Sequence, residues 1–232
     1  MNIVVTGGTK GIGRAIVELF AEKGFDVIIT ARNESDLNVF KSELTDKFPT
    51  IKVFVWAFDI GKKEEVMAFS VALAAEFSQV DVLVNNAGVF KPGTICEEED
   101  GVFESIMNIN IAGSYHLTRA LMPLIRKTKD AHIFNICSTA SIIAYTNGGS
   151  YSISKFAMLG FSKVLREELK SDGIKVTAVL PGATYTNSWV GTTLPESRFM
   201  PSFEIAKAVW GCYDLKSAVV EELLIRPQLG DL

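Results

Sequence analysis

Short apolar runs rich in β-branched residues alternate with longer amphipathic stretches along the whole chain. The runs have the length of strands and occupy residues 3–5, 26–30, 52–56, 81–84, 132–136, 175–180 and 222–226. Helical patterns fill the intervals between them, and these connections are long enough for right-handed crossovers between parallel strands. The alternation therefore predicts a doubly wound α/β fold, in which a seven-stranded parallel sheet carries helices on both faces.

No repeat, low-complexity segment or Pro/Ser-rich linker divides the 232 residues, so we expect one domain over 1–232. The net charge of −4 and the pI near 5.3 argue against nucleic acid or an anionic membrane as partner. No apolar run approaches the ~18 residues that span a bilayer. The first strand begins so close to Met1 that we expect no signal peptide.

The cysteines and histidines are few and scattered. Cys96, Cys137 and Cys212 are odd in number and far apart, which is typical of free thiols in a reducing cytoplasm. His116 and His132 are the only histidines, and no close pair of cysteines accompanies them. We therefore expect a cytoplasmic protein without a metal site.

A glycine-rich segment, Thr6-Gly-Gly-Thr-Lys-Gly-Ile-Gly13, joins the first strand to a helical pattern that we expect to begin at Arg14. Its glycines let the backbone turn sharply and approach a ligand, and the start of a helix attracts a pyrophosphate. The spacing differs from G-x-G-x-x-G because residue 16 is Ile, and from a Walker A loop because Gly11 follows Lys10. An ordinary glycine-rich turn is the alternative.

Two further polar sites follow predicted strands. In Asn85-Asn-Ala-Gly88, the small residues would let the backbone lie against a flat ring, and the asparagines could tie neighbouring strands together. A plain Asn/Gly turn is the alternative. Asp59 could accept a hydrogen bond from an adenine amino group, or it could cap the next helix.

Asn110 lies within a helical pattern, on the same apolar stripe as Ile106, Gly113 and Leu117. An Asn at that position lowers helix propensity and needs a buried partner. We expect that partner to be structural. The functional alternative is that Asn110 braces a water molecule in a proton path.

Ser138 ends the fifth predicted strand, and Tyr151 and Lys155 follow with the spacing that puts them on one face of a helix. Lowering a phenol pKa from ~10 to ~7 requires about 4 kcal/mol. An exposed ion pair supplies only ~1 kcal/mol, so Lys155 must act in a partly desolvated site beside an oxidised nicotinamide. Ser138 would then bind the substrate oxygen. A surface Tyr and Lys on a solvated helix is the alternative.

Taken together, these motifs and Pro181-Gly182…Thr186 resemble the short-chain dehydrogenase/reductase family in order and spacing over essentially the whole chain. The resemblance implies a Rossmann fold and a catalytic tetrad of Asn110, Ser138, Tyr151 and Lys155, with Lys155 also holding the nicotinamide ribose. It implies that the nicotinamide end contacts Pro181, Gly182 and Thr186, with Thr186 near the carboxamide. The remaining cofactor-binding residues that it implies are Thr6, Gly7, Thr9, Lys10, Gly11, Ile12, Gly13, Asp59, Asn86, Ala87, Gly88, Tyr151 and Thr184.

The dinucleotide that we predict is NADP(H) rather than NAD(H). The second strand ends at Ala31, where a carboxylate would bind a ribose 2′-hydroxyl and repel a 2′-phosphate. Arg32 follows, and with Lys10 it would suit a doubly charged phosphate, as in family members that prefer NADP. The alternative is that both are solvated surface charges and that Glu34 pairs with Arg32.

The segment 185–201 lacks strong periodicity, so we interpret it as a flexible lid over the substrate. Aromatic candidates for an apolar pocket wall, or simply for core positions, are Phe90, Tyr145, Trp189 and Phe199. Segments 181–189 and 220–232 resemble bacterial sepiapterin-reductase-like members of the family more than its ketoacyl-carrier-protein reductases.

We therefore predict a cytoplasmic NADP(H)-dependent oxidoreductase that acts on a small-molecule carbonyl or secondary alcohol, with Tyr151 as general acid/base. The family resemblance also implies a homodimer or homotetramer built from helices around 100–127 and 151–170. A non-catalytic NADP(H)-binding regulatory or sensor protein is the main alternative. An epimerase or dehydratase on a related fold is the third, although such enzymes usually carry a longer C-terminal region.

Overall fold

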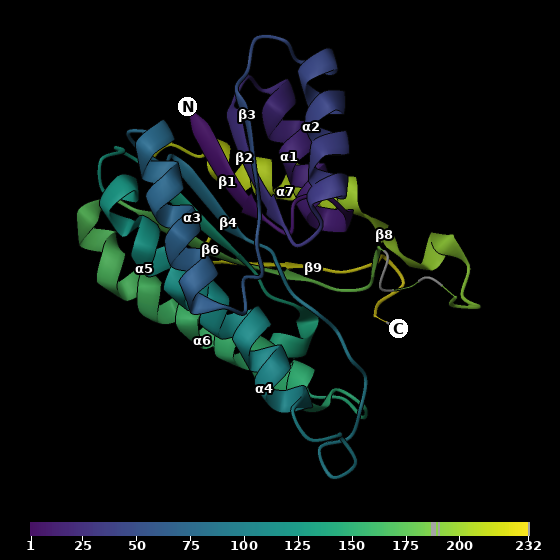
Figure 1. The fold of residues 1–232 in the computed structure, drawn as a ribbon. Helices are drawn as coiled ribbons and strands as arrows, with labels where there is room; N and C mark the ends of the chain where they lie inside the picture. The colour runs from purple at the N-terminus through teal and green to yellow at the C-terminus, as the bar shows by residue number, and fades with distance from the viewer. Residues whose placement is uncertain (187–188, 190, 232) are drawn as a thin grey trace.

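The computed structural model describes residues 1–186, 189 and 191–231, and a parallel sheet of seven strands forms its centre (Figure 1). The strand order is β3-β2-β1-β4-β5-β6-β9, which confirms the predicted doubly wound fold. The strands are β1 (Asn2–Thr6), β2 (Asp26–Ala31), β3 (Val53–Ala57), β4 (Val82–Asn85), β5 (His132–Ile136), β6 (Lys175–Pro181) and β9 (Glu222–Ile225). A separate parallel pair, β7 (Thr184–Tyr185) and β8 (Met200–Pro201), was not predicted.

Helices cover both faces of the sheet, as Figure 1 shows. One hydrophobic core joins Val5 of β1 to α1, α2 and α7, and a second joins Val4 to α3, α5 and α6. Consecutive β1 residues therefore face opposite cores, which explains why this strand is an unbroken apolar run. The helices are α1 (Gly11–Glu22), α2 (Glu34–Lys47), α3 (Lys63–Glu76), α4 (Val102–Met107), α5 (Gly113–Ile125), α6 (Gly149–Leu169) and α7 (Ser202–Asp214). Among the residues described, no helix combines the length and hydropathy needed to cross a bilayer.

The strand order reverses between β1 and β4, because the chain runs from β1 to β2 and β3 on one side and places β4 on the other. Ligands of doubly wound sheets bind beyond the carboxyl ends of the strands at such a point. Here β1 ends at Thr6 and β4 at Asn85, and the two loops that follow carry the glycine-rich and Asn-Ala-Gly motifs. The fold thus brings two motifs distant in sequence to one edge of the sheet.

Candidate functional site

The glycine-rich segment turns directly into α1. The helix begins at Gly11, earlier than the predicted Arg14, so Gly11 and Gly13 lie in its first turn. A Cβ on Gly13 would lie 2.4 Å from both the Gly7 carbonyl oxygen and Asn86 Nδ2. Gly7 has a φ of +62°, a conformation that glycine adopts without strain. Only glycine therefore fits the close contact between the start of α1 and the loop after β4.

The start of α1 is open to an anion. Among the described residues, no side chain caps this helix and no acidic residue stands in its first turn. By contrast, α2 is capped by Asn33 and has Glu34 and Asp36 in its first turn. Free N–H groups and the positive end of the helix dipole therefore remain available at α1, which is the chemistry that a pyrophosphate requires.

Thr6 and Asn86 lock the two loops together. Thr6 Oγ1 accepts hydrogen bonds from the backbone N–H of Asn86 at 3.0 Å and of Ala87 at 2.9 Å. In return, Asn86 Nδ2 donates to the carbonyl oxygens of Thr6 at 2.8 Å and Gly7 at 3.0 Å. The chain after β4 is consequently fixed beside the glycine loop, with Gly88 next in line.

Tyr151 and Lys155 lie on one face of α6, as their spacing predicts. Lys155 is 7% exposed, and its Nζ donates to the Ile136 carbonyl oxygen at 2.9 Å. The same Nζ lies 5.7 Å from the centroid of the Tyr151 ring. A Cβ built on Gly88 would lie 3.8 Å from this Nζ, so the loop after β4 passes close to the ammonium group.

Burial changes the pKa of Tyr151 and the pKa of Lys155 in opposite directions. It raises the pKa of Tyr151 above its ordinary value, although hydrogen bonding with Ser138 lowers that pKa in part. Burial also lowers the pKa of Lys155, because the charged ammonium loses its hydration. In the chain alone, the phenol is therefore held in its protonated form, ready to donate.

Ser138 lies two residues beyond the end of β5 and caps the short helical turn Thr139–Ser141. Its Oγ accepts from the Ala140 N–H at 3.1 Å, while Ser141 Oγ accepts from the Ser138 N–H at 3.2 Å. The first bond orients the hydroxyl and still leaves its proton free to be donated, and the second holds the backbone of Ser138.

Asn110 differs from the prediction of a regular helix, because it sits in a π-helical turn, Asn108–Ala112, between α4 and α5. Its Oδ1 accepts from the Val89 N–H at 2.8 Å, and its Nδ2 donates to the Val89 carbonyl oxygen at 3.0 Å and to Ser154 Oγ at 2.9 Å. The buried amide thus has the structural partners that we expected. It clamps the loop after β4 to α6, the helix that carries Tyr151.

Asp59 forms a local turn. Its Oδ1 accepts from the Gly61 N–H at 2.9 Å, and its own N–H donates to Glu65 Oε2 at 2.7 Å. The alternative that Asp59 caps the next helix is wrong, because Lys62 occupies that position before α3.

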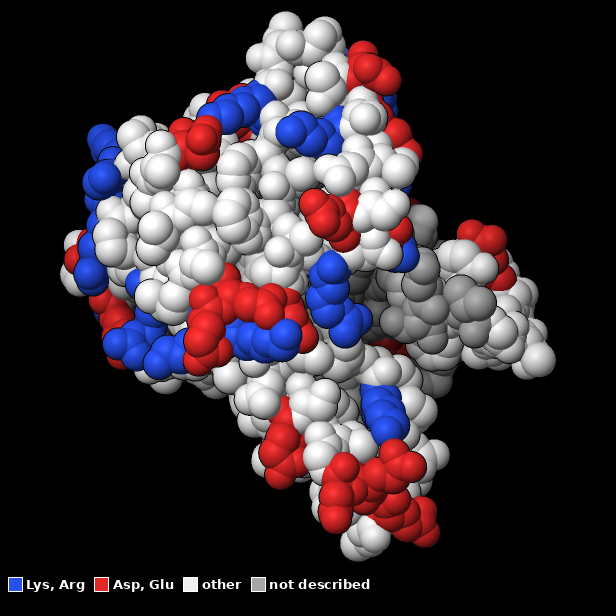
Figure 2. All heavy atoms as spheres, viewed as in Figure 1, with Lys and Arg blue, Asp and Glu red and all other residues white. Residues whose placement is uncertain are grey.

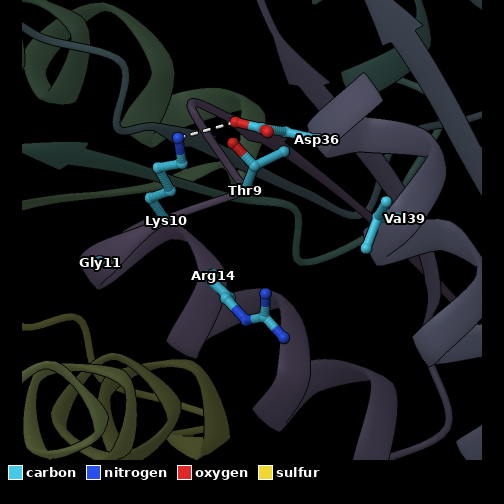
Figure 3. A pocket seen from close by; sticks show the side chains of 6 residues that line it. All are labelled: Thr9, Lys10, Gly11, Arg14, Asp36 and Val39. Atoms are coloured by element: carbon cyan, nitrogen blue, oxygen red, sulfur yellow. Dashed lines mark ion pairs between the residues drawn. The ribbon is translucent and has the colours of Figure 1, made fainter. Parts of the chain in front are cut away.

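The two cations expected near an adenosine ribose differ in their surroundings. Lys10 Nζ forms an ion pair with Asp36 Oδ2 at 2.7 Å (Figure 3). Arg32 is exposed and forms no ion pair within the described part of the chain, so the suggested pairing with Glu34 is not formed. Beside Lys10 lies an open hollow of about 380 Å³ lined by Thr9, Lys10, Gly11, Arg14, Asp36 and Val39.

Sequence reasoning missed Arg14 and Asp36 in this hollow. Arg14 forms ion pairs with Glu18 at 2.8 Å and with Glu43, and its guanidinium lies 4.3 Å from the Phe40 ring centroid. Arg14 follows Lys10 by four residues and lies in the first turn of α1, and this spacing could have indicated that the two side chains share one side of the helix. For Asp36, the signal was its place in the first turn of α2.

The nicotinamide-end candidates lie at the last residue of β6 and in the segment that follows it. The Gly182 N–H donates to the Ile225 carbonyl oxygen at 2.8 Å, and Thr184 Oγ1 donates to the Gly182 carbonyl oxygen at 3.0 Å. A Cβ on Gly11 would lie 3.0 Å from the Thr186 methyl carbon. The segment after β6 therefore lies over the glycine loop, with Pro181 at the end of β6 leading into it.

Of the four aromatic residues predicted as candidates for a pocket wall, Tyr145 is 46% exposed and the other three form two separate ring contacts. The Phe90 ring meets the Tyr151 ring edge to face at a centroid distance of 4.9 Å. Trp189 packs against the buried Phe199 at 4.8 Å. Asn187, Ser188 and Val190 of the predicted lid lie outside the described residues.

Comparison with known proteins gives one consistent family. The model of the short chain dehydrogenase family matches residues 1–195. The sepiapterin reductase of Chlorobaculum tepidum is 31% identical over 99% of this chain and 97% of its own length.

Two solved structures are similar over almost their full length. An alcohol dehydrogenase from Thermococcus sibiricus, complexed with 5-hydroxy-NADP, has a TM-score of 0.89 and 27% identity, covering 97% of this chain and 96% of its own. The L-sorbose reductase of Gluconobacter frateurii, complexed with NADPH and L-sorbose, has a TM-score of 0.88 and 26% identity, covering 97% and 94%.

Proposed function

Because the chain belongs to the short-chain dehydrogenase/reductase family, we propose that it is an NADP(H)-dependent oxidoreductase acting on a small-molecule carbonyl or secondary alcohol. The observation that carries this proposal is the buried ammonium of Lys155 beneath the protonated phenol of Tyr151, with Ser138 hydrogen-bonded to that phenol. A proton donor, a charge to stabilise its conjugate base and a donor for the substrate oxygen meet at the carboxyl ends of the sheet.

The residues present fit a dinucleotide. The uncapped start of α1 suits the pyrophosphate, and Gly7 and Gly13 allow the backbone to approach it. Lys155 suits the nicotinamide ribose and Asp59 the adenine. The other residues that we propose as contacts are Thr6, Thr9, Lys10, Gly11, Ile12, Arg32, Asn86, Ala87, Gly88, Tyr151, Pro181, Gly182, Thr184 and Thr186.

A preference for NADP(H) is supported by the end of β2. Ala31 stands at the position where an Asp or Glu would repel a 2′-phosphate. The neighbouring Arg32 is exposed and is therefore available to bind that phosphate. The NADP-bound structural neighbours agree with this choice. Ala31→Asp should reverse the preference, measured as the ratio of kcat/KM for NADPH and NADH. An unchanged ratio would count against the assignment.

In the proposed reaction, NADPH supplies the hydride that reduces the carbonyl carbon. Tyr151 donates its phenolic proton to the substrate oxygen, which Ser138 Oγ holds in place by a hydrogen bond. The ammonium of Lys155 then stabilises the phenolate, because opposite charges interact strongly in a desolvated site. Asn110 holds the loop after β4 against α6, so that Gly88 and the proton donor Tyr151 keep their relative positions.

Replacement of Tyr151 by Phe tests the proposal. We expect turnover to fall by about 10²-fold or more, since general acid catalysis is lost. NADPH affinity, measured by fluorescence titration, should change little. Tyr213→Phe, on the remote helix α7, is the matched control.

Activity should be assayed on a panel of diketones, short acyl thioesters, pterins and sugars. NADPH binding without oxidation across that panel would favour the sensor alternative, and retained turnover in Tyr151→Phe would refute the role of the phenol.

We also propose a homodimer or homotetramer. Large apolar side chains are 40–56% exposed on α4, α5 and α6, namely Phe103, Tyr115, Ile153, Phe156 and Val164. Burying such a surface between copies would remove it from water. Sedimentation of the wild type and of Phe156→Glu tests this: the variant should dissociate.

A further inference from the structure

The first turn of α6 receives its cap from a distant part of the chain. Among the described residues, no side chain of the segment entering α6 caps this helix. Instead, Glu98 Oε1 accepts from the Ser150 N–H at 2.9 Å, and Glu98 Oε2 accepts from the Ser150 hydroxyl. Ser150 is the residue directly before Tyr151. A carboxylate on this N–H also complements the positive end of the helix dipole.

The backbone of Gly149 lies so close to Glu98 and Gly93 that a larger residue would not fit at position 149. A Cβ on Gly149 would lie 2.2 Å from Glu98 Oε1 and 2.6 Å from the Gly93 carbonyl oxygen. The Gly93 N–H in turn donates to the Asn147 carbonyl oxygen at 3.1 Å. Residues 89–101, which we name the strap, therefore lie directly against the loop that enters α6.

Two more contacts hold the strap, one with Tyr151 of α6 and one with Asn110 in the π-helical turn before α5. The Phe90 ring meets the Tyr151 ring, and Asn110 holds both backbone polar groups of Val89. The strap is thus fixed near the sheet by Asn110 and at the start of α6 by Glu98. In Figure 1 the loop before α4 extends away from the sheet, and Figure 2 shows acidic side chains gathered there.

Glu98 differs from its acidic neighbours in what it contacts. Glu97 is exposed and accepts only from Thr94 Oγ1 within the described residues, at 3.0 Å. Glu99 forms an exposed ion pair with Lys91. The two hydrogen bonds from Ser150 lower the pKa of Glu98, with a smaller contribution from Lys91, so the carboxylate stays ionised at neutral pH.

We propose that Glu98 is a positioning residue, which caps α6 from the strap and thereby holds Tyr151 in line with Ser138. This inference rests on the proposed oxidoreductase function. It assigns Glu98 no contact with substrate or cofactor; the carboxylate acts through Ser150 on the neighbouring phenol. A displacement of a donor by a fraction of an ångström is enough to slow proton transfer.

The test compares Glu98→Ala and Glu98→Gln with the matched control Glu97→Ala. Gln can still accept from the Ser150 N–H and donate to its hydroxyl, so it should rescue most of the effect. Glu98→Ala should lower kcat for reduction of 2,3-butanedione by about tenfold, while the Kd for NADPH stays within about twofold. Hydrogen exchange of the amides of residues 150–153 should accelerate about tenfold in Glu98→Ala and remain unchanged in Glu97→Ala.

Two outcomes would overturn the assignment. One is a Glu98→Ala variant with unchanged kcat and exchange, and the other is equal loss in Glu98→Ala and Glu97→Ala. A merely structural cap would lower the melting temperature without the selective loss of kcat in the folded variant, and that result also overturns it. If the wild type binds NADPH but reduces neither 2,3-butanedione nor any carbonyl of the panel, the proposed function fails, whereas the exchange data still decide whether Glu98 holds the start of α6.

Discussion

His132 should make the fold sensitive to mild acid. It lies at the start of β5, 1% exposed, with its ring stacked on Phe134 at a centroid distance of 3.9 Å. Its Nε2 lies 2.8 Å from Thr177 Oγ1. The Thr177 hydroxyl already donates to the Val220 carbonyl oxygen at 2.6 Å, so it must accept from the histidine. The proton is therefore on Nε2, and Nδ1 has no partner among the described residues.

Burial lowers the pKa of His132 from 6.5 to about 3, and the charge of Lys175 adds to the effect. In the unfolded chain the imidazole is protonated as the pH falls below 6.5, whereas in the folded chain it stays neutral down to about pH 3. The stability contributed by the neutral imidazole is therefore complete above pH 6.5 and is lost as the pH falls from 6.5 toward 3. The loss amounts to about 2 kcal/mol at pH 5 and about 4 kcal/mol at pH 3, with a limit of ~5 kcal/mol below both pKa values.

Urea denaturation at pH 7 and pH 5 measures this loss. His132→Gln is the informative variant, because its amide nitrogen can still donate to Thr177 and does not titrate. The unfolding free energy of the variant should fall by about 2 kcal/mol less than that of the wild type between the two pH values. All other titrating groups are shared, so their contributions cancel in the comparison.

The half-buried His116 provides a matched control, since His116→Gln also removes one imidazole. Its pKa is lowered as well, mainly by partial burial, so a smaller change in the same direction is expected. Equal pH dependence in the wild type and His132→Gln would refute the reasoning, because it would mean that the imidazole is protonated in the folded state.

Two further predictions concern the glycine loop. Gly13→Ala should lower the free energy of unfolding by about 1–3 kcal/mol in urea titrations and weaken NADPH binding, because its Cβ would collide with the Gly7 carbonyl oxygen and Asn86 Nδ2. Unchanged stability would mean that the loop relaxes freely. Asp36→Asn should tighten NADPH binding by about two- to fivefold in calorimetric titrations at low salt, because it releases Lys10 from an exposed ion pair. An equal gain for NADH would show that the 2′-phosphate is not what Lys10 binds.

The five inner strands of the main sheet were predictable because they are buried on both sides, whereas the edge strands β3 and β9 are partly exposed. A parallel strand between two helical layers must be apolar along its length, and the run 3–5 and the strand Asn2–Thr6 differ only at their ends. The pair β7 and β8 was not predictable, because strands of two residues have no periodicity. Their pairing depends on how the chain folds between residues 185 and 200, which brings β8 back beside β7.

The sequence predicted the candidate site residues that follow strands, but not the side-chain contacts that hold those residues in place. Ser138 and the Asn-Ala-Gly motif could be placed because each follows a run that was already identified as a strand. The ion pair of Lys10 with Asp36 and the bond of Glu98 to Ser150 join segments whose separation in space only the folded chain defines. No local pattern distinguishes Glu98 from Glu97 beside it.

Lys155 and Asn110 show how a departure from local preference can still mark a site. A lysine that is 7% exposed and an asparagine in the middle of a helical run both cost stability where they stand. Each is stabilised by a contact from another element: the carbonyl oxygen of Ile136 binds one, and the backbone of Val89 binds the other. The fold could have placed an apolar side chain at either position without such support. The chain instead carries a buried cation and an amide, and a Cβ built on Gly88 would lie 3.8 Å from Lys155 Nζ and 3.4 Å from Asn110 Oδ1. For Lys155 the reason that we propose is chemical, because its charge would stabilise the phenolate that Tyr151 becomes when it gives up its proton.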